Sequence, residues 1–87
     1  MYKVLIVDDE SIIRKGLRNI IDWKGLGCDI CGEASDGIEG IQMIKELRPD
    51  IIITDINMPE IDGLTMIRET KQQLPECKII ILTGYRD

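Results

Sequence analysis

The hydrophobic positions of the chain fall into two patterns, unbroken apolar runs and stripes with helical spacing. Unbroken runs occupy residues 4–7 and 51–53, and such runs are typical of parallel strands with helices on both faces. Another strand is expected between these two runs, at 29–34, after the glycine-containing breaker at 22–27, and a last one at the apolar run 78–82. The sequence therefore predicts four strands, over residues 3–7, 29–34, 51–54 and 78–82.

Stripes of apolar residues spaced three and four apart connect these strands and predict three helices, over residues 11–21, 36–48 and 64–74. The side chain of Asp36 can cap the second helix while Glu39 reaches back, and Pro49 ends that helix because it disfavours helical geometry in the residue before it. In the first helix we expect Arg14, Lys15 and Arg18 on the solvent side. The side chains expected to face the core are Ile13, Leu17, Ile20 and Ile21, then Ile38, Ile41, Ile44 and Leu47, and finally Leu64, Ile67 and Leu74.

Strands and helices alternate as βαβαβαβ, without repeats or an internal linker. Strands separated by helices of this length pair in parallel through right-handed crossovers. We therefore predict an α/β fold, a flavodoxin-like doubly wound parallel sheet with strand order 2-1-3-4. Such sheets place their sites at the carboxyl ends of the strands where the strand order reverses. The ends of the first and third strands are the expected place for function.

The charge and the apolar runs of the chain argue against two classes of partner, nucleic acids and membranes. The 87 residues carry a formal net charge of −5, with Lys and Arg scattered along the sequence, so we expect no nucleic acid to bind this chain itself. No apolar run approaches the roughly 18–20 residues of a membrane span, and strand-like residues follow the first Met at once, so we expect no signal peptide, no membrane contact and a cytoplasmic location. Histidine is absent, which leaves carboxylates and hydroxyls for any chemistry.

The cysteines do not favour a metal or redox site. Cys28 and Cys31 form a C-x-x-C pair, but both lie along the predicted second strand, where residues three apart point to opposite faces. One metal ion could not easily bind both, and the chain has no second pair and no histidine. We expect these two residues and Cys77 to be buried or half-buried free thiols in a reducing compartment.

Acidic residues end the two strands that meet at the predicted reversal. Asp8 and Asp9 follow the first strand, and Asp55 follows the apolar run of the third. We expect the three carboxylates to converge, with the hydroxyl of Thr83 joining them from the fourth strand and Gly84 leaving space beside it. A single acid would more often be a polar cap of its strand end, whereas three acids with a hydroxyl on one edge favour a site.

Three carboxylates so close repel one another, and a hard divalent cation relieves that repulsion. Oxygen ligands, few in number and with room for water, suit Mg²⁺ better than zinc or Ca²⁺. A bound Mg²⁺ can also neutralise charge on a phosphoryl group while a carboxylate attacks it. Asp55, alone at the tip of the central strand, is the better candidate for that nucleophile, and the pair Asp8 and Asp9 suits cation binding.

Three segments at this edge resemble the receiver domain of two-component response regulators: Val7-Asp8-Asp9-Glu10, Thr54-Asp55-Ile56-Asn57-Met58-Pro59-Glu60-Ile61-Asp62-Gly63 and Ile81-Leu82-Thr83-Gly84. The resemblance covers the whole chain and implies that a sensor histidine kinase transfers a phosphoryl group from its phosphohistidine to Asp55. It also implies that Asp9, Asp55 and the backbone carbonyl of Asn57 bind Mg²⁺, that Asp8 helps through water, and that Thr83 is the switch hydroxyl. The segment at 22–28 is similar to receivers that precede AraC-type DNA-binding domains.

The family also has features that this sequence does not match. Its members have a fifth strand, two further helices and a lysine that pairs with the phosphoryl group, whereas Lys78 begins the fourth strand at the opposite end of the sheet. We therefore expect residues 1–87 to form a truncated receiver domain that acts as a transfer partner and not as an enzyme on a free substrate. The alternative is a receiver-derived interaction module that is not efficiently phosphorylated. We also expect the fourth strand, 78–82, to be an open apolar edge that forms a homodimer or larger homo-oligomer.

Overall fold

The computed structural model describes residues 1–56 and 63–82 of the chain. Its elements are β1 (Tyr2–Val7), α1 (Ser11–Ile20), a short 3-10 helix (Lys24–Leu26), β2 (Cys28–Ala34), α2 (Gly37–Leu47), β3 (Ile51–Asp55), α3 (Gly63–Gln73) and β4 (Lys78–Leu82). The four strands are parallel in the order β2-β1-β3-β4. The predicted fold class and strand order are confirmed, and each predicted helix or strand end lies within one residue of the observed one.

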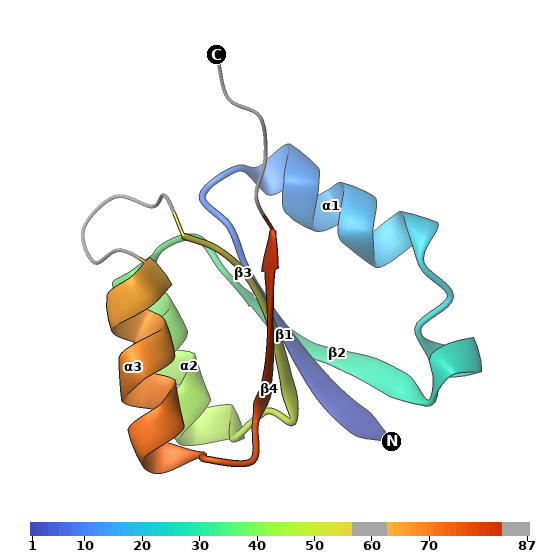
Figure 1. The fold of residues 1–87 in the computed structure, drawn as a ribbon. Coiled ribbons are helices and arrows are strands. Elements are labelled where there is room, and N and C mark those ends of the chain that lie inside the picture. The colour runs from blue at the N-terminus through green and yellow to red at the C-terminus, as the bar shows by residue number, and fades with distance from the viewer. Residues whose placement is uncertain (57–62, 83–87) are drawn as a thin grey trace.

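Strand β1 runs through the middle of the sheet, with β2 on one side and β3 on the other (Figure 1). Its residues 4–7 are fully buried, as expected for an unbroken apolar strand between two helical layers. The register against β2 shifts after Val4, which pairs with Ile30 while Leu5 pairs with Gly32. The two faces of this sheet are covered very differently.

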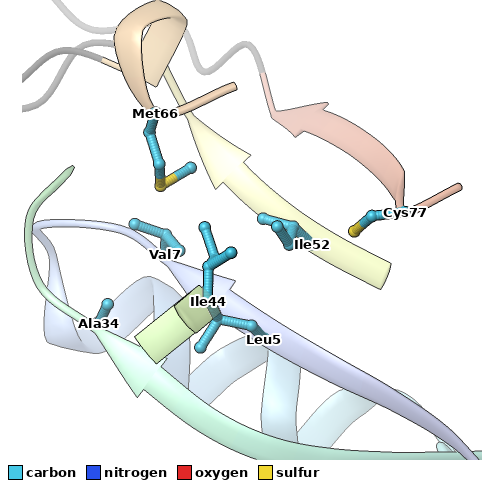
Figure 2. Close-up of a cluster of buried hydrophobic side chains, with 7 residues drawn as sticks. All are labelled: Leu5, Val7, Ala34, Ile44, Ile52, Met66 and Cys77. Atoms are coloured by element: carbon cyan, nitrogen blue, oxygen red, sulfur yellow. The ribbon is translucent and has the colours of Figure 1, made fainter. Parts of the chain in front are cut away.

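Helices α2 and α3 lie side by side on one face of the sheet (Figure 1). Between them and the strands, a core cluster of buried side chains forms, in which Met66 of α3 lies above Val7 and Ile44 of α2 lies against Leu5 (Figure 2). A Cβ atom at Gly40 would lie 2.7 Å from the sulfur of Met66, so the glycine allows the two helices to approach closely. This core cluster consists of Leu5, Val7, Ala34, Ile44, Ile52, Met66 and Cys77.

Helix α1 lies on the opposite face and is covered much less (Figure 1). Leu17 and Trp23 pack against a smaller cluster built on Val4, Ile6, Cys28 and Ile53, but no residue of α1 is buried. The prediction that Ile13 and Ile20 face the core is wrong, since Ile20 is 84% exposed and Ile13 is also exposed. Together with Ile12, Gly16, Leu17 and Ile21 they line an open apolar hollow of about 350 Å³.

Two other predicted core positions are also wrong. Ile38 of α2 and Leu64 of α3 are exposed, because each lies on the side of its helix that turns away from the sheet. In α3 the buried positions are instead Gly63, Met66 and Thr70. Leu74 lies just beyond the helix and packs on the core cluster as expected.

The ends of α2 follow the predicted local chemistry. The backbone N–H of Glu39 donates to the side chain of Asp36 at 2.7 Å, which confirms the expected N-cap. At the other end Arg48 adopts a left-handed conformation, and its N–H donates to the carbonyl of Ile44. That residue ends the helix directly before Pro49.

Asp50 joins three strands at the amino ends of the sheet, which we call the amino edge. Its backbone N–H donates to Lys3 of β1 and its carbonyl accepts from Lys78 of β4. Its carboxylate accepts the N–H of Lys3 at 2.7 Å. The residue before β3 therefore fixes β1 and β4 relative to it. None of the helices in the described part of the chain is long and apolar enough to cross a membrane.

Candidate functional site

Three aspartates meet at the carboxyl ends of β1 and β3, which we call the carboxyl edge. The two strands are paired up to Val7 and Thr54, so the residues that follow emerge side by side. One carboxylate oxygen from each of Asp8, Asp9 and Asp55 lies within 4.8 Å of the others. Asp8 and Asp55 are buried and Asp9 is exposed. The predicted convergence of these acids is confirmed.

Asp8 is held in the connection between β1 and α1 by bonds in two directions. Its backbone N–H donates to the carbonyl of Ala34 at the end of β2, at 3.0 Å. Its carboxylate accepts the N–H of Glu10 at 2.9 Å, a bond that closes a tight local turn. The carbonyl of Glu10 then accepts the N–H groups of Ile13 and Arg14. The start of α1 and the direction of Asp8 are thus fixed together.

Asp55 is held at the tip of β3 by close backbone packing. The hydroxyl of Thr54 donates to the carbonyl of Asp55 at 2.9 Å, and the N–H of Gly63 donates to the carbonyl of Ile56 at 3.0 Å. A Cβ atom at Gly63 would lie 2.5 Å from the Asp55 carbonyl oxygen and from the Ile56 Cα. Only glycine fits there, so the start of α3 lies directly against the backbone that carries Asp55.

The chemistry of this site follows from its donor set. Three carboxylates, each with a formal negative charge, lie together. Two unit charges about 4 Å apart repel by about 1 kcal/mol in water and about 4 kcal/mol at the effective dielectric constant of a protein surface. A divalent cation with a preference for oxygen would turn this repulsion into attraction. The exposure of Asp9 leaves room for water or a phosphoryl group beside such an ion. The residues present therefore fit Mg²⁺.

Three predicted site residues lie outside the described residues, namely Asn57, Thr83 and Gly84. The described part of β4 ends at Leu82, whose register partner is Asp55. The roles expected for the carbonyl of Asn57, the hydroxyl of Thr83 and the space at Gly84 stay predictions.

Sequence reasoning missed an arginine beside the site. Arg14 was expected on the solvent side of α1, but its guanidinium donates to the backbone carbonyl of Asp8 and forms an ion pair with Glu33 at 3.3 Å. Its side chain is 17% exposed. Arg18, one turn later, pairs with the same Glu33 at 2.7 Å and is 46% exposed. Two arginines four residues apart and an acid in the next strand were the available signal.

The cysteines lie as the strand pattern predicted. Cys28 belongs to the cluster on the α1 face, whereas Cys31 packs on the core cluster of the other face. Both are free, as is Cys77. Burial raises the pKa of Cys31 and of Cys77, so neither thiol is activated at neutral pH. One metal ion cannot use Cys28 and Cys31 together.

Comparisons with known proteins agree on one family. A family model described as the response regulator receiver domain matches residues 4–87. The uncharacterized transcriptional regulatory protein YesN of Bacillus subtilis is 41% identical over 85 residues, which are 98% of this chain and 23% of that protein. The transcriptional regulatory protein HptR of Staphylococcus aureus is 40% identical over 87 residues, which are 100% of this chain and 34% of that protein.

Solved structures give the same result. The REC domain of AraT, a response regulator from Geobacillus stearothermophilus, superposes with a TM-score of 0.94 at 43% identity, over 97% of this chain and 65% of that one. A two-component transcriptional regulator AraC from Clostridium phytofermentans superposes with a TM-score of 0.90 at 38% identity, over 100% of this chain and 70% of that one. The chain thus spans well under half of these two curated relatives and about two thirds of these solved chains.

Proposed function

The chain belongs to the response regulator receiver domain family, and on that premise we propose that it accepts a phosphoryl group on Asp55 from a sensor histidine kinase. The observation that carries the proposal is the convergence of Asp8, Asp9 and Asp55 at the ends of two neighbouring strands. A set of three acids has little structural purpose there, because each adds to the repulsion that the others feel.

In this proposal a carboxylate oxygen of Asp55 attacks the phosphorus of the kinase's phosphohistidine. The phosphorus–nitrogen bond breaks and its electron pair stays with the imidazole. Asp9, Asp55 and the backbone carbonyl of Asn57 would hold Mg²⁺, with Asp8 acting through water, and the ion would supply neutralisation of charge on the phosphoryl oxygens. Thr83 is proposed as the switch hydroxyl.

The chain is proposed to act as a transfer partner and not as an enzyme, since Asp55 itself carries the product. Its three free thiols suit the reducing cytoplasm. Relatives named as transcriptional regulators are much longer than the match, so we place any DNA-binding output in a longer parent protein. The net charge of −5 supports the proposal that this chain itself binds no nucleic acid.

Labelling with a small phosphodonor tests the assignment of Asp55. Acetyl phosphate with Mg²⁺ should add one phosphoryl group to the wild type, detected by intact mass, and none to Asp55→Ala. Asp50→Ala, at the other end of β3, is the matched control and should be labelled like the wild type. Labelling that persists in Asp55→Ala would contradict the proposal.

A second candidate function rests on β4. In the described residues β4 has a neighbouring strand on one side, β3, and two of its isoleucines, Ile80 and Ile81, are exposed. Unpaired backbone groups beside apolar side chains are a template for pairing with another chain. The proposed assembly is a homodimer that pairs antiparallel about a two-fold axis near Ile80.

Sedimentation of wild type and Ile80→Lys tests this assembly. Ile80 and Ile38 are each 50% exposed, but Ile38 lies on α2, so Ile38→Lys is the matched control for an added charge. Ile80→Lys should sediment as a monomer, and the wild type and Ile38→Lys as a dimer. A well-folded monomeric wild type would refute the edge pairing.

A further inference from the structure

Arg14 occupies a junction between α1, β2 and the loop that carries two of the three acids. Its guanidinium reaches the end of β2 through Glu33 and the end of β1 through the carbonyl of Asp8. The contact to Asp8 is a direct hydrogen bond of 2.5 Å. The side chain is mostly buried, so this bridge is poorly accessible to competing water.

The carbonyl that Arg14 binds belongs to the peptide group between Asp8 and Asp9. A peptide group is planar, so a bond that fixes its carbonyl also fixes its plane. That plane contains the Cα atoms of Asp8 and Asp9, so its orientation determines where the two carboxylate side chains begin. The N–H of Asp8, on the preceding peptide group, is tied to Ala34. The bond from Arg14 adds a restraint on the following peptide group, the one between Asp8 and Asp9.

We propose that Arg14 is a positioning residue for the acid cluster: its bridge between Glu33 and the Asp8 carbonyl holds Asp8 and Asp9 toward Asp55 in the geometry that binds a divalent cation. The inference rests on the proposed function in one respect, namely that the cluster binds Mg²⁺. The arginine acts through the backbone and stays outside the ligand set. This role separates it from Arg18, which pairs with the same Glu33.

The role requires an arginine because two acceptors must be reached at once. A guanidinium presents several N–H donors in a rigid fork, whereas an ammonium group is a compact point charge on a flexible stem. Arg14 uses Nε toward Glu33 and Nη1 toward Asp8. Lysine at this position would keep the charge but lose the fixed bridge. Arg14→Lys therefore changes the geometry of the site without changing its net charge.

The first test compares Arg14→Lys with Arg18→Lys by calorimetric titration of Mg²⁺. Both variants keep the charge and keep a cation near Glu33, but only Arg14→Lys affects the Asp8 carbonyl. Arg14→Lys should weaken Mg²⁺ binding about tenfold, the lower end of the range for groups that orient metal ligands, and Arg18→Lys should bind like the wild type. Equal affinities for Arg14→Lys and wild type, or equal losses in the two variants, would overturn the proposal.

A second test needs no metal ion, so it separates failure of this inference from failure of the proposed function. In metal-free buffer, Asp55→Asn should raise the melting temperature because one repelling charge is removed. That rise should be smaller in the Arg14→Lys background, where the loosened peptide group lets Asp8 and Asp9 move away from Asp55. In the Arg18→Lys background the rise should be unchanged. An undiminished rise with Arg14→Lys overturns the role of Arg14 even if the wild type binds no Mg²⁺.

Glu33→Gln covers the case in which Arg14→Lys does not fold. This variant leaves Arg14 in place but weakens its anchor on β2, so Mg²⁺ binding should weaken to a smaller extent than the tenfold expected for a lost bridge. Mg²⁺ affinity equal to that of wild type in a folded Glu33→Gln would count against the bridge.

Discussion

Strand β3 has an aspartate at each end, and the two residues have opposite surroundings. Asp50, at the amino edge, is exposed, and its carboxylate accepts the backbone N–H of Lys3. Asp55, at the carboxyl edge, is buried and lies with two other carboxylates. The same residue type thus makes a strand-to-strand contact at the amino end of β3 and joins an anionic cluster at its carboxyl end.

The difference shows how a structural acid can be told from a functional one. Asp50 lowers the free energy of the fold because its charge meets a donor. We expect Asp55 to raise it, because its charge meets like charges, and a protein retains such an arrangement where a cation or a reacting group offsets the repulsion. Substitutions at Gly63, Asp55 and Asp50 test this contrast.

Adding a methyl group behind Asp55 should have the largest effect on stability. Gly63→Ala would place a Cβ atom 2.5 Å from backbone atoms of Asp55 and Ile56, and backbone cannot give way as a side chain can. We expect a loss of about 3 kcal/mol in the free energy of unfolding, measured by urea denaturation. Gly16→Ala is the control, since its added Cβ would meet no atom within 4 Å apart from its chain neighbours and the nearby backbone of its own helix, and it should be neutral or stabilise α1 by up to about 1 kcal/mol. Similar losses in both variants would show that the tip of β3 is not specially constrained.

Removing the charge of Asp55 should stabilise the protein when no divalent cation is present. Asp55→Asn relieves repulsion with Asp8 and Asp9, and we expect a gain of about 1–2 kcal/mol in chelator-treated, low-salt buffer. The gain should shrink in high salt, because screening weakens the repulsion in the wild type. A destabilised Asp55→Asn in metal-free buffer would show that Asp55 is a structural acid.

The acid at the other end of β3 should respond in the opposite direction, with a smaller effect. Asp50→Ala removes the acceptor for the N–H of Lys3, and we expect a loss of about 1 kcal/mol, measured by the same denaturation. Asp50→Asn keeps an acceptor oxygen and should lose less. If Asp50→Ala were as stable as the wild type, the exposed contact would contribute nothing and the contrast would rest on Asp55 alone.

The sequence predicted the features that follow from local patterns, such as where strands end and how helices are capped. Parallel strands end at the same edge of a sheet, so Asp8, Asp9 and Asp55 could be brought together without coordinates. Likewise the cap at Asp36 follows from local chemistry alone.

The sequence did not predict the features that depend on which parts of other helices, strands or loops lie next to a residue. Helical spacing identified the apolar stripe of α1, but spacing does not say whether another element covers it, and Ile20 is exposed. The same pattern placed Arg14 toward solvent, because it cannot show that Glu33 and the Asp8 carbonyl lie within reach of its long side chain. The need for glycine at position 63 was hidden for the same reason.

Calorimetric titration of Mg²⁺ into the wild type, Asp50→Asn and Asp55→Asn tests most directly the central claim that the acids of the carboxyl edge share one divalent cation. The account predicts one Mg²⁺ per chain with equal affinity in the wild type and Asp50→Asn, because the amino edge takes no part in binding. It predicts at least about tenfold weaker binding in Asp55→Asn, which lacks one charged ligand. Undiminished binding in Asp55→Asn, or a loss of binding in Asp50→Asn, would contradict it.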